Sequence, residues 1–390
     1  MKTVMIVAGE SSGELYGSLL AKALKARLPD VHMLGVGGEK MKDAGVDLIA
    51  STSDAFGLIE AVSAYRQVKT AFKKAVEAIE KFKPEVLILI DYPDFNIRLA
   101  RVARAAGIKI LYYVSPQVWA WRKGRIKQIA EIVDRIAVIL PFEENIYREA
   151  GVKCEFVGHP ILEEIKSVLQ TASSRQHPEL RAHFKTILGF DPRMPLLSLL
   201  PGSRPSELKR LLPLMLDVVR QFKTEVKESA DKYQICIPLA PNTEESKYAD
   251  YLNKLRHEGV EIKKGESVRV LAASDIAVVA SGTATLQTAL IEVPMVVVYK
   301  LSPLTYVLGK LIVNVKYISL VNILAGREVV KELIQKRANP EEIIKEIKRI
   351  IFDMKYKEEI LNNYRLIKKP FLDKRTSERV AEMVIEMASR

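Results

Sequence analysis

Residues 276-IAVVASGTATLQTALIEVPMVVVYK-300 decide the fold class of this sequence. The stretch reads as an apolar strand, a turn of small residues at Ser281, Gly282 and Thr283, an apolar helix, and a second strand opened by Pro294. Such a turn leaves backbone N–H groups unpaired at the helix N-terminus, where an anion is the natural ligand. The turn has neither the lysine of a P-loop nor a G-x-G-x-x-G pattern, so it is not one of the common nucleotide motifs.

The same alternation of strand and helix extends in both directions from this stretch. The expected strands are 3–9, 31–38, 46–50, 86–91, 109–114, 135–140 and 155–158, and then 196–203, 233–240, 260–264, 276–281 and 295–300. Apolar strands separated by helices indicate parallel sheets covered on both faces. The sequence therefore predicts an α/β protein with two Rossmann-like domains, residues 1–165 and 185–370, facing each other across a cleft. A final helix over residues 371–390 is expected to pack back on the N-terminal domain.

Composition and charge limit the classes of function. The chain has 390 residues, 48% of them hydrophobic and 28% charged, with a formal net charge of +12, which favours anionic partners. No groove motif of aromatic and basic residues supports a nucleic-acid partner. The two cysteines, Cys154 and Cys236, lie in strand-like runs and fit reduced thiols in the cytosol. The N-terminal apolar run is too short for a signal peptide, and no stretch has the length of a membrane span, so we expect no export.

In the first domain, candidate catalytic residues follow two apolar strands. Ser11 and Ser12 bring hydroxyls to the turn 8-AGESSGE-14, which suits a phosphate or sugar hydroxyls; the equal alternative is that Ser12 caps the next helix. Asp91 ends the strand 86–90, so its carboxylate can reach the cleft and serve as a general base. Asp94 has a more ordinary explanation as a cap of the helix that Phe95 opens.

In the second domain, two turns suit a diphosphate. Ser203 and the backbone of 201-PGSR-204 can accept a phosphate, and Arg204 supplies a guanidinium fork. Together with Ser281, Gly282 and Thr283, this turn would neutralise a nucleoside diphosphate without a metal. The histidines have no cysteine or carboxylate at ligand spacing, so neither a metal nor any other cofactor is expected.

The motifs taken together resemble the lipid-A-disaccharide synthase family over nearly the whole chain. They are VAGESSGE, IDYPDFN, YYVSPQVWAWR, PFEENIY followed by FVGHP, LLPGSR, ASGTATLQTAL and NILAGREVVKELIQ. The resemblance implies a GT-B fold and an inverting, metal-independent glycosyltransferase on the cytoplasmic face of the inner membrane of Gram-negative bacteria. It implies that UDP-2,3-diacylglucosamine is joined to 2,3-diacylglucosamine 1-phosphate, whose 6-hydroxyl attacks the anomeric carbon and releases UDP, in lipopolysaccharide synthesis.

The resemblance also implies roles for single residues. Asp91 would be the catalytic base, with Glu10 and Ser12 beside the acceptor in residues 1–165, and Asn322 would lie at the nucleotide site. Arg204, Ser203, Ser281, Gly282 and Thr283 would hold the UDP diphosphate in residues 185–370. Gln287 stands where many GT-B enzymes place a glutamate that binds the ribose hydroxyls. The resemblance further implies a homodimer that exchanges the C-terminal part of the chain, so Asn322 could serve the partner's site.

An apolar stretch near residue 60 is a candidate for contact with membrane or acyl chains. Phe56, Leu58, Ile59 and Val62 give 55-AFGLIEAVSAYRQV-68 a hydrophobic face with basic residues beside it. The net positive charge would hold such a face at an anionic membrane. The alternative is that these residues are buried core.

Two other functions fit parts of the pattern. A UDP-N-acetylglucosamine 2-epimerase-like isomerase would share the fold and the UDP site but need no lipid acceptor. A regulatory protein that binds UDP-sugars without turnover would not need a base at Asp91. Release of UDP that depends on the acceptor would separate the transferase from both.

Overall fold

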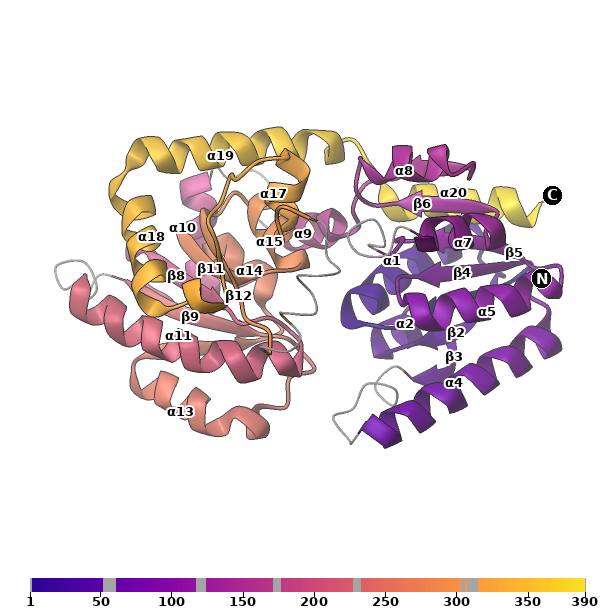
Figure 1. The fold of residues 1–390 in the computed structure, drawn as a ribbon, viewed down its shortest axis with the longest axis horizontal. Helices are drawn as coiled ribbons and strands as arrows, with labels where there is room; N and C mark the ends of the chain where they lie inside the picture. The colour runs from indigo at the N-terminus through magenta and orange to yellow at the C-terminus, as the bar shows by residue number, and fades with distance from the viewer. Residues whose placement is uncertain are drawn as a thin grey trace. The chain divides into compact units, whose positions relative to one another are not determined.

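The computed structural model describes residues 2–51, 61–116, 124–170, 177–226, 233–302, 306 and 315–389, with the backbone alone for residues 11, 61–65 and 177. These residues form two compact units. Unit 1 comprises Met1–Glu163 and Pro370–Arg390, and unit 2 comprises Glu164–Lys369 (Figure 1). The predicted α/β fold with two Rossmann-like domains is confirmed, because each unit contains one parallel sheet with helices packed on it.

The sheet of unit 1 has seven parallel strands in the order β3-β2-β1-β4-β5-β6-β7. The strands are β1 (Thr3–Ala8), β2 (His32–Gly37), β3 (Asp47–Ser51), β4 (Val86–Ile90), β5 (Lys109–Tyr113), β6 (Arg135–Val138) and β7 (Cys154–Phe156). The helices are α1 (Ser11–Arg27), α2 (Glu39–Asp43), α4 (Ala61–Phe82), α5 (Pro93–Ala105), α7 (Gly124–Ile132), α8 (Glu143–Glu149) and α20 (Thr376–Ala388). Helix α9 (Ile161–Leu169) contains the boundary between the units.

The sheet of unit 2 has six parallel strands in the order β10-β9-β8-β11-β12-β13. The strands are β8 (Leu196–Leu200), β9 (Gln234–Leu239), β10 (Val260–Lys264), β11 (Ile276–Ala280), β12 (Met295–Tyr299) and β13 (Glu332–Ile334). The helices are α10 (His177–Leu188), α11 (Pro205–Glu225), α13 (Ala249–His257), α14 (Ser267–Ala273), α15 (Thr283–Leu290), α17 (Leu320–Ala325), α18 (Pro340–Phe352) and α19 (Met354–Lys368). Single 3₁₀ turns cover Glu245–Tyr248, Gln335–Arg337 and Lys369–Phe371.

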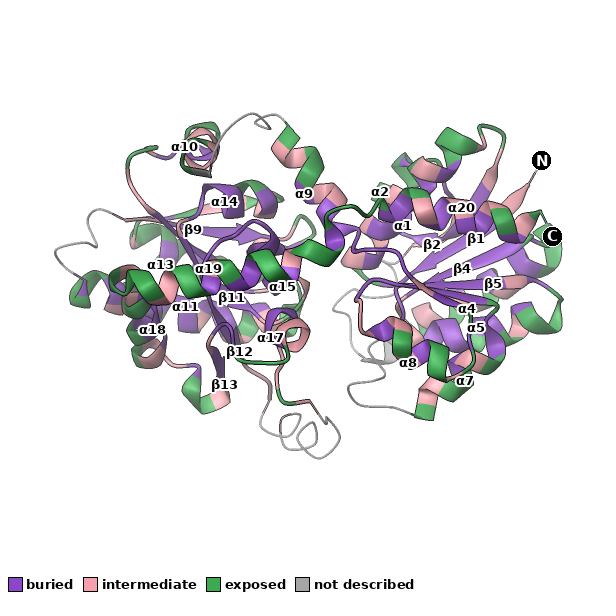
Figure 2. Cartoon of the chain, turned by 90° about the horizontal axis from the view of Figure 1, so that it is seen from above, coloured by how far each residue is buried: buried purple, intermediate pink, exposed green. Residues whose placement is uncertain are grey.

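The central strands are the most buried parts of both units. Every residue of β4, β8 and β11 is buried. Figure 2 shows β4 and β11 in purple, with helices around them. Strands that are apolar on both faces must be covered on both faces, which is why their sequence shows no alternation of polar and apolar residues. Among the described residues, no helix combines the length and the apolar character needed to cross a bilayer.

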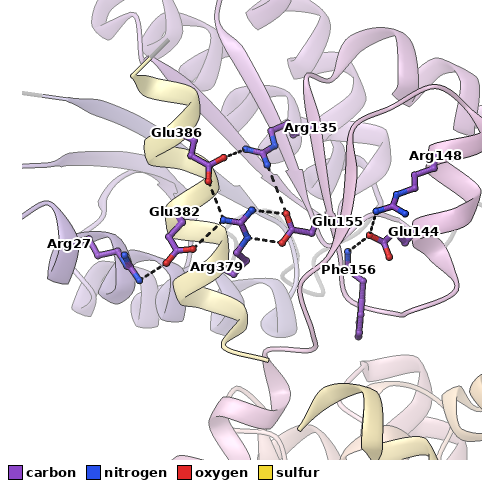
Figure 3. A network of polar contacts seen from close by, with 9 residues as sticks. All are labelled: Arg27, Arg135, Glu144, Arg148, Glu155, Phe156, Arg379, Glu382 and Glu386. Atoms are coloured by element: carbon purple, nitrogen blue, oxygen red, sulfur yellow. Dashed lines mark hydrogen bonds and ion pairs between the residues drawn. The ribbon is translucent and has the colours of Figure 1, made fainter. Parts of the chain in front are cut away.

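The C-terminal helix α20 packs on unit 1 through a network of ion pairs (Figure 3). Arg379 donates to both carboxylate oxygens of Glu155, at 2.6 and 2.8 Å, and Arg135 donates to Glu386 at 2.6 Å. The hydrogen bond from Arg379 lowers the pKa of Glu155, and burial partly opposes that shift. Arg135 is buried, whereas both side chains of the pair of Arg27 with Glu382 are 39% exposed, so that exposed pair contributes little to the attachment.

Candidate active site

Each sheet has one point where the strand order reverses, and the candidate residues gather there. In unit 1 the chain builds outward from β1 to β3 and then returns to place β4 beside β1. In unit 2 it builds outward from β8 to β10 and returns to place β11 beside β8. Ligands of open parallel sheets bind outside the carboxyl ends of the strands at such a point. The four loops after β1, β4, β8 and β11 hold most of the residues singled out from the sequence.

The loop after β1 packs directly against the loop after β4. A Cβ atom on Gly9 would lie 2.4 Å from Cγ of Tyr92, so only glycine leaves room for that ring. Glu10 is exposed and is the N-cap residue of α1, where its carbonyl accepts from the N–H of Glu14 at 2.8 Å. Ser12 is half-buried in the first turn of α1, so the alternative prediction that Ser12 is the cap is wrong.

Asp91 follows β4 with a backbone that few residues adopt. Its φ angle is +48°, and that of Tyr92 is +47°, both in the left-handed region. The carbonyl of Asp91 accepts hydrogen bonds from the Tyr112 hydroxyl at 2.7 Å and from Nδ2 of Asn96 at 2.8 Å. Its N–H donates to the carbonyl of Val114 at 3.0 Å. Asp91 is half-buried, and its constrained backbone holds it in a fixed position at the carboxyl end of β4.

The sequence suggested that Asp94 caps a helix, and this prediction is wrong. Helix α5 begins at Pro93, the first-turn position where proline costs no hydrogen bond, and Tyr92 is its N-cap residue. Asp94 therefore lies inside the first turn, where its carboxylate accepts from Arg125 at 2.6 Å. Burial raises the pKa of Tyr92, and the carboxylates of Asp94 and Glu10 raise it further. Glu10 and Tyr92 therefore lie within electrostatic reach of each other.

The PGSR turn after β8 is already occupied by a carboxylate of the chain. Glu207 accepts from the backbone N–H groups of Ser203 and Arg204, both at 3.1 Å. A Cβ atom on Gly202 would lie 2.1 Å from the same carboxylate, and the φ angle of Gly202 is +93°. Pro205 has no N–H, so the exposed side chains of Ser203 and Arg204 are what this turn offers a ligand.

Tyr299, at the end of β12, interacts electrostatically with the PGSR turn. Burial raises the pKa of Tyr299 and Glu207 raises it further, while Arg204 and Arg210 act in the opposite direction. The phenol therefore lies within electrostatic reach of both guanidinium groups. The sequence did not single out Glu207 or Tyr299, although a glutamate three residues after a helix cap is a known signal of an N-terminus.

The turn after β11 brings backbone N–H groups to the start of α15. The N–H groups of Gly282, Thr283 and Ala284 stand at the start of α15, where no earlier helical turn can accept them. The Ser281 hydroxyl donates to the carbonyl of Ile318 at 2.8 Å, and Oγ1 of Thr285 accepts from the N–H of Leu320 at 3.2 Å. Gly282 is exposed and Thr283 is half-buried.

Gln287 and Asn322 are both buried in unit 2. Nε2 of Gln287 donates to Glu164 of α9 at 3.3 Å. Asn322 is 0% exposed; its amide donates to the carbonyl of Val330 and to Glu332, both at 2.9 Å. Its Oδ1 accepts from the N–H groups of Val329 and Val330 at 2.7 and 3.0 Å. Every polar atom of the Asn322 side chain is thus bonded within the chain.

Glu332 extends this network toward the anion-binding turn. Its buried carboxylate accepts from the N–H groups of Ile318 and Ser319, and from the Ser319 hydroxyl at 2.7 Å. The carbonyl of Ile318 accepts the hydrogen bond of the Ser281 hydroxyl. Asn322 and Glu332 therefore act on the turn after β11 indirectly, by holding the segment that contains Ile318.

We expect Asn322→Ala to destabilise unit 2 by about 2 to 5 kcal/mol, because it leaves the buried N–H groups of Val329 and Val330 without their acceptor and removes one donor from the Glu332 carboxylate. Urea unfolding followed by circular dichroism measures the loss, with Asn253→Ala, an exposed asparagine on α13, as the control. An equal and small effect of both variants would contradict the role assigned to the network.

His159 of the FVGHP motif follows β7, outside these four loops. His159 is buried, its Nδ1 accepts from the N–H of Ile161 at 3.2 Å, and burial lowers its pKa to about 3, so the ring is neutral at neutral pH. Phe56, Leu58 and Ile59 lie outside the described residues, as does the side chain of Val62. In the part of the chain that the structure describes, no group of three or more histidine, cysteine or carboxylate side chains could hold a metal.

In the described part of unit 1, two cavities lie near the amino ends of β5, β6 and β7. Their volumes are about 390 and about 400 Å³, and Arg135 and Lys153 line both. Glu386 and Met387 of α20 line the second cavity, and no described candidate site residue lines either one.

Two Rossmann-like units, each with polar loops at its switch point, define a protein of the GT-B-like fold class. Solved structures of this class match the chain, at sequence identities that support the fold alone. UDP-GlcNAc 2-epimerase from Neisseria meningitidis bound to UDP-GlcNAc has a TM-score of 0.70 at 11% identity, with 99% of this chain and 100% of that chain covered. A trehalose-6-phosphate protein from E. coli bound with UDP-2-fluoro glucose has a TM-score of 0.57 at 12% identity, with coverages of 100% and 99%.

The sequence comparisons are more specific than the structural ones. The family described as Lipid-A-disaccharide synthetase matches residues 4–384. Lipid-A-disaccharide synthase from Syntrophus aciditrophicus is 46% identical over 352 residues, covering 90% of this chain and 88% of the relative. The enzyme of the same name from Myxococcus xanthus is 38% identical over 388 residues, covering 98% and 97%. The chain belongs to the lipid-A-disaccharide synthase family, which confirms the predicted glycosyltransferase and leaves the epimerase as a distant structural relative.

Proposed function

We propose that this protein joins UDP-2,3-diacylglucosamine to 2,3-diacylglucosamine 1-phosphate with inversion at the anomeric carbon. The 6-hydroxyl of the acceptor forms the new bond to the anomeric carbon, and its proton passes to Asp91. The bond between that carbon and the diphosphate breaks, and its electron pair leaves with UDP. The product is the β-1,6-linked disaccharide 1-phosphate.

The observation that most supports this chemistry is the Asp91 carboxylate, held on a constrained backbone at the switch point of unit 1. A general base must meet the acceptor hydroxyl within hydrogen-bond reach, and a rigid loop lowers the cost of keeping it there. Glu10 lies in the adjacent loop and Ser12 in the first turn of α1. We assign both to the acceptor sugar, because their oxygens can hydrogen-bond its hydroxyl groups.

The UDP diphosphate is assigned to unit 2. The N–H groups of Gly282 and Thr283 and the positive end of α15 favour an anion there. Arg204 adds a full positive charge, and the Ser203 hydroxyl adds a donor. Gln287 is proposed to contact the ribose, although its amide also donates to Glu164. Asn322 is proposed to act on the nucleotide site through the Ile318 segment.

Association with the inner face of the inner membrane and a homodimer with exchange of the C-terminal part are also proposed, both from the family. The substrates are lipids, so the enzyme must meet a membrane surface to reach them. Size-exclusion chromatography with light scattering tests the dimer independently of activity.

One assay separates the proposed function from its alternative. The protein is incubated with each acylated glucosamine alone and with both, in the presence and absence of EDTA, and UDP and the sugar products are measured. We expect UDP only when both substrates are present, and equal rates with EDTA because the turns and Arg204 supply the positive potential at the diphosphate. Formation of an epimerised UDP-sugar without acceptor would favour the epimerase.

The membrane contact has its own prediction. Changing Phe56 and Leu58 to serine should move the protein from anionic vesicles into solution, since each inserted side chain contributes about 1.5 to 3 kcal/mol. Liposome co-sedimentation measures the binding, and a melting curve of the same variant is the control. A large fall in the melting temperature would instead place these side chains in the core.

A further inference from the structure

The main chain of Asp91 is held by two buried side chains from different elements. Tyr112 lies in the middle of the sheet on β5, and Asn96 lies on the first turns of α5; both are 0% exposed. The Tyr112 hydroxyl and Nδ2 of Asn96 donate to the same acceptor, the Asp91 carbonyl, at 2.7 and 2.8 Å. Nδ2 of Asn96 also reaches the carbonyl of Ile90 at 3.3 Å.

These hydrogen bonds meet at a strained part of unit 1. Asp91 and Tyr92 have consecutive left-handed φ angles, and Val114, whose carbonyl accepts the N–H of Asp91, has a φ of +61°. Left-handed conformations are unfavourable for residues with a Cβ and worst for β-branched ones, so they persist only where surrounding contacts hold them. Without Tyr112 and Asn96, the local preference would return Asp91 to an extended or right-handed backbone and turn its carboxylate away.

The chemistry of Tyr112 suits a permanent donor. Burial raises the pKa of its phenol well above the usual value, and the Asp91 carboxylate raises it further. The hydroxyl therefore keeps its proton at any pH at which the enzyme works, and the bond to the Asp91 carbonyl is always available.

We infer that Tyr112 and Asn96 are positioning residues that hold the Asp91 backbone in its left-handed conformation and so aim the general base at the acceptor. The inference rests on the proposed function, because it needs Asp91 to be the base. Neither side chain touches the acceptor: each acts on the main chain of Asp91 from the buried side of the loop.

Tyr113 offers a matched control. It follows Tyr112 on β5, is also 0% exposed, and points to the opposite face of the sheet because side chains alternate along a strand. Within the described residues, its hydroxyl makes no hydrogen bond to the Asp91 loop. Tyr112→Phe and Tyr113→Phe remove the same single oxygen from neighbouring buried sites.

We expect Tyr112→Phe to lower kcat about ten- to a hundredfold, since a small displacement of a catalytic group has effects of this size. The KM for each substrate should change by less than about twofold, because the binding groups are untouched. Hydrogen exchange of the peptide over residues 88–97 should become faster in Tyr112→Phe and stay unchanged in Tyr113→Phe. Equal kcat and equal exchange in the two variants would overturn the inference.

A double-mutant cycle separates this inference from the proposed function. In an Asp91→Asn background, adding Tyr112→Phe should leave the residual rate unchanged within about twofold, because no base remains to be aimed. Multiplication of the two effects would show that Tyr112 acts independently of Asp91 and would overturn the inference. Full activity of Asp91→Asn alone would overturn the base assignment itself.

Discussion

Asp91→Asn should lower the rate of disaccharide formation by about 10²- to 10⁴-fold, the usual contribution of a positioned general base. The amide fills the same space as the carboxylate, and the hydrogen bonds to the Asp91 carbonyl do not involve the side chain, so the loop should keep its shape. The amide cannot take the proton of the acceptor 6-hydroxyl. The affinity for UDP, measured by calorimetry, should stay near that of the unchanged protein, because the turns proposed to hold the diphosphate belong to unit 2.

Asp94→Asn is the matched control for this prediction. Asp94 lies three residues further on, is exposed and pairs with Arg125 at 2.6 Å, so its loss removes the same charge from the same loop region. We expect its rate to fall less than about threefold, since an exposed ion pair contributes little. Near-normal turnover by Asp91→Asn would move the base elsewhere, and Glu10 in the neighbouring loop would be tested next.

The strands could be predicted from the sequence because each central strand is covered on both faces and is therefore a continuous apolar run. Leu196–Leu200 and Ile276–Ala280 are examples, and the turns that follow them could be located for the same reason. Strand β13, Glu332–Ile334, was missed because it is short, lies at the sheet edge, and begins with a glutamate. Glu332 accepts hydrogen bonds from Ile318, Ser319 and Asn322, and no local sequence pattern predicts these partners.

The hydrogen-bond partners of the polar residues could not be predicted from the sequence. Asn322 lies in a motif typical of the family, yet all of its side-chain bonds are internal. A strand-to-helix turn predicts donors for an anion, but whether a ligand or a nearby carboxylate accepts from them depends on side-chain geometry. At the PGSR turn the acceptor is Glu207, whereas the start of α15 has no comparable carboxylate among the described residues.

This difference between the two turns sets the size of the effect expected for Arg204→Ala. Because Glu207 already accepts from the N–H groups of Ser203 and Arg204, the guanidinium is the only cation within residues 201–204. Without it, the turn would present the Glu207 carboxylate to the diphosphate and repel it. We therefore expect a loss of about 10²- to 10³-fold in kcat, since the guanidinium is also proposed to stabilise the charge that develops on departing UDP.

The same substitution should weaken UDP binding at least about tenfold, so that binding and turnover fall together. Lys209→Ala is the control: it removes one positive charge from an exposed position on the same helix, α11, and so tests the effect of net charge alone. Its UDP affinity should stay within about twofold at 0.15 M salt, where exposed charges more than roughly 8 Å apart are largely screened. Unchanged UDP affinity in Arg204→Ala, measured by calorimetry, would show that the PGSR turn does not hold the diphosphate, and the anion site would then rest on the start of α15.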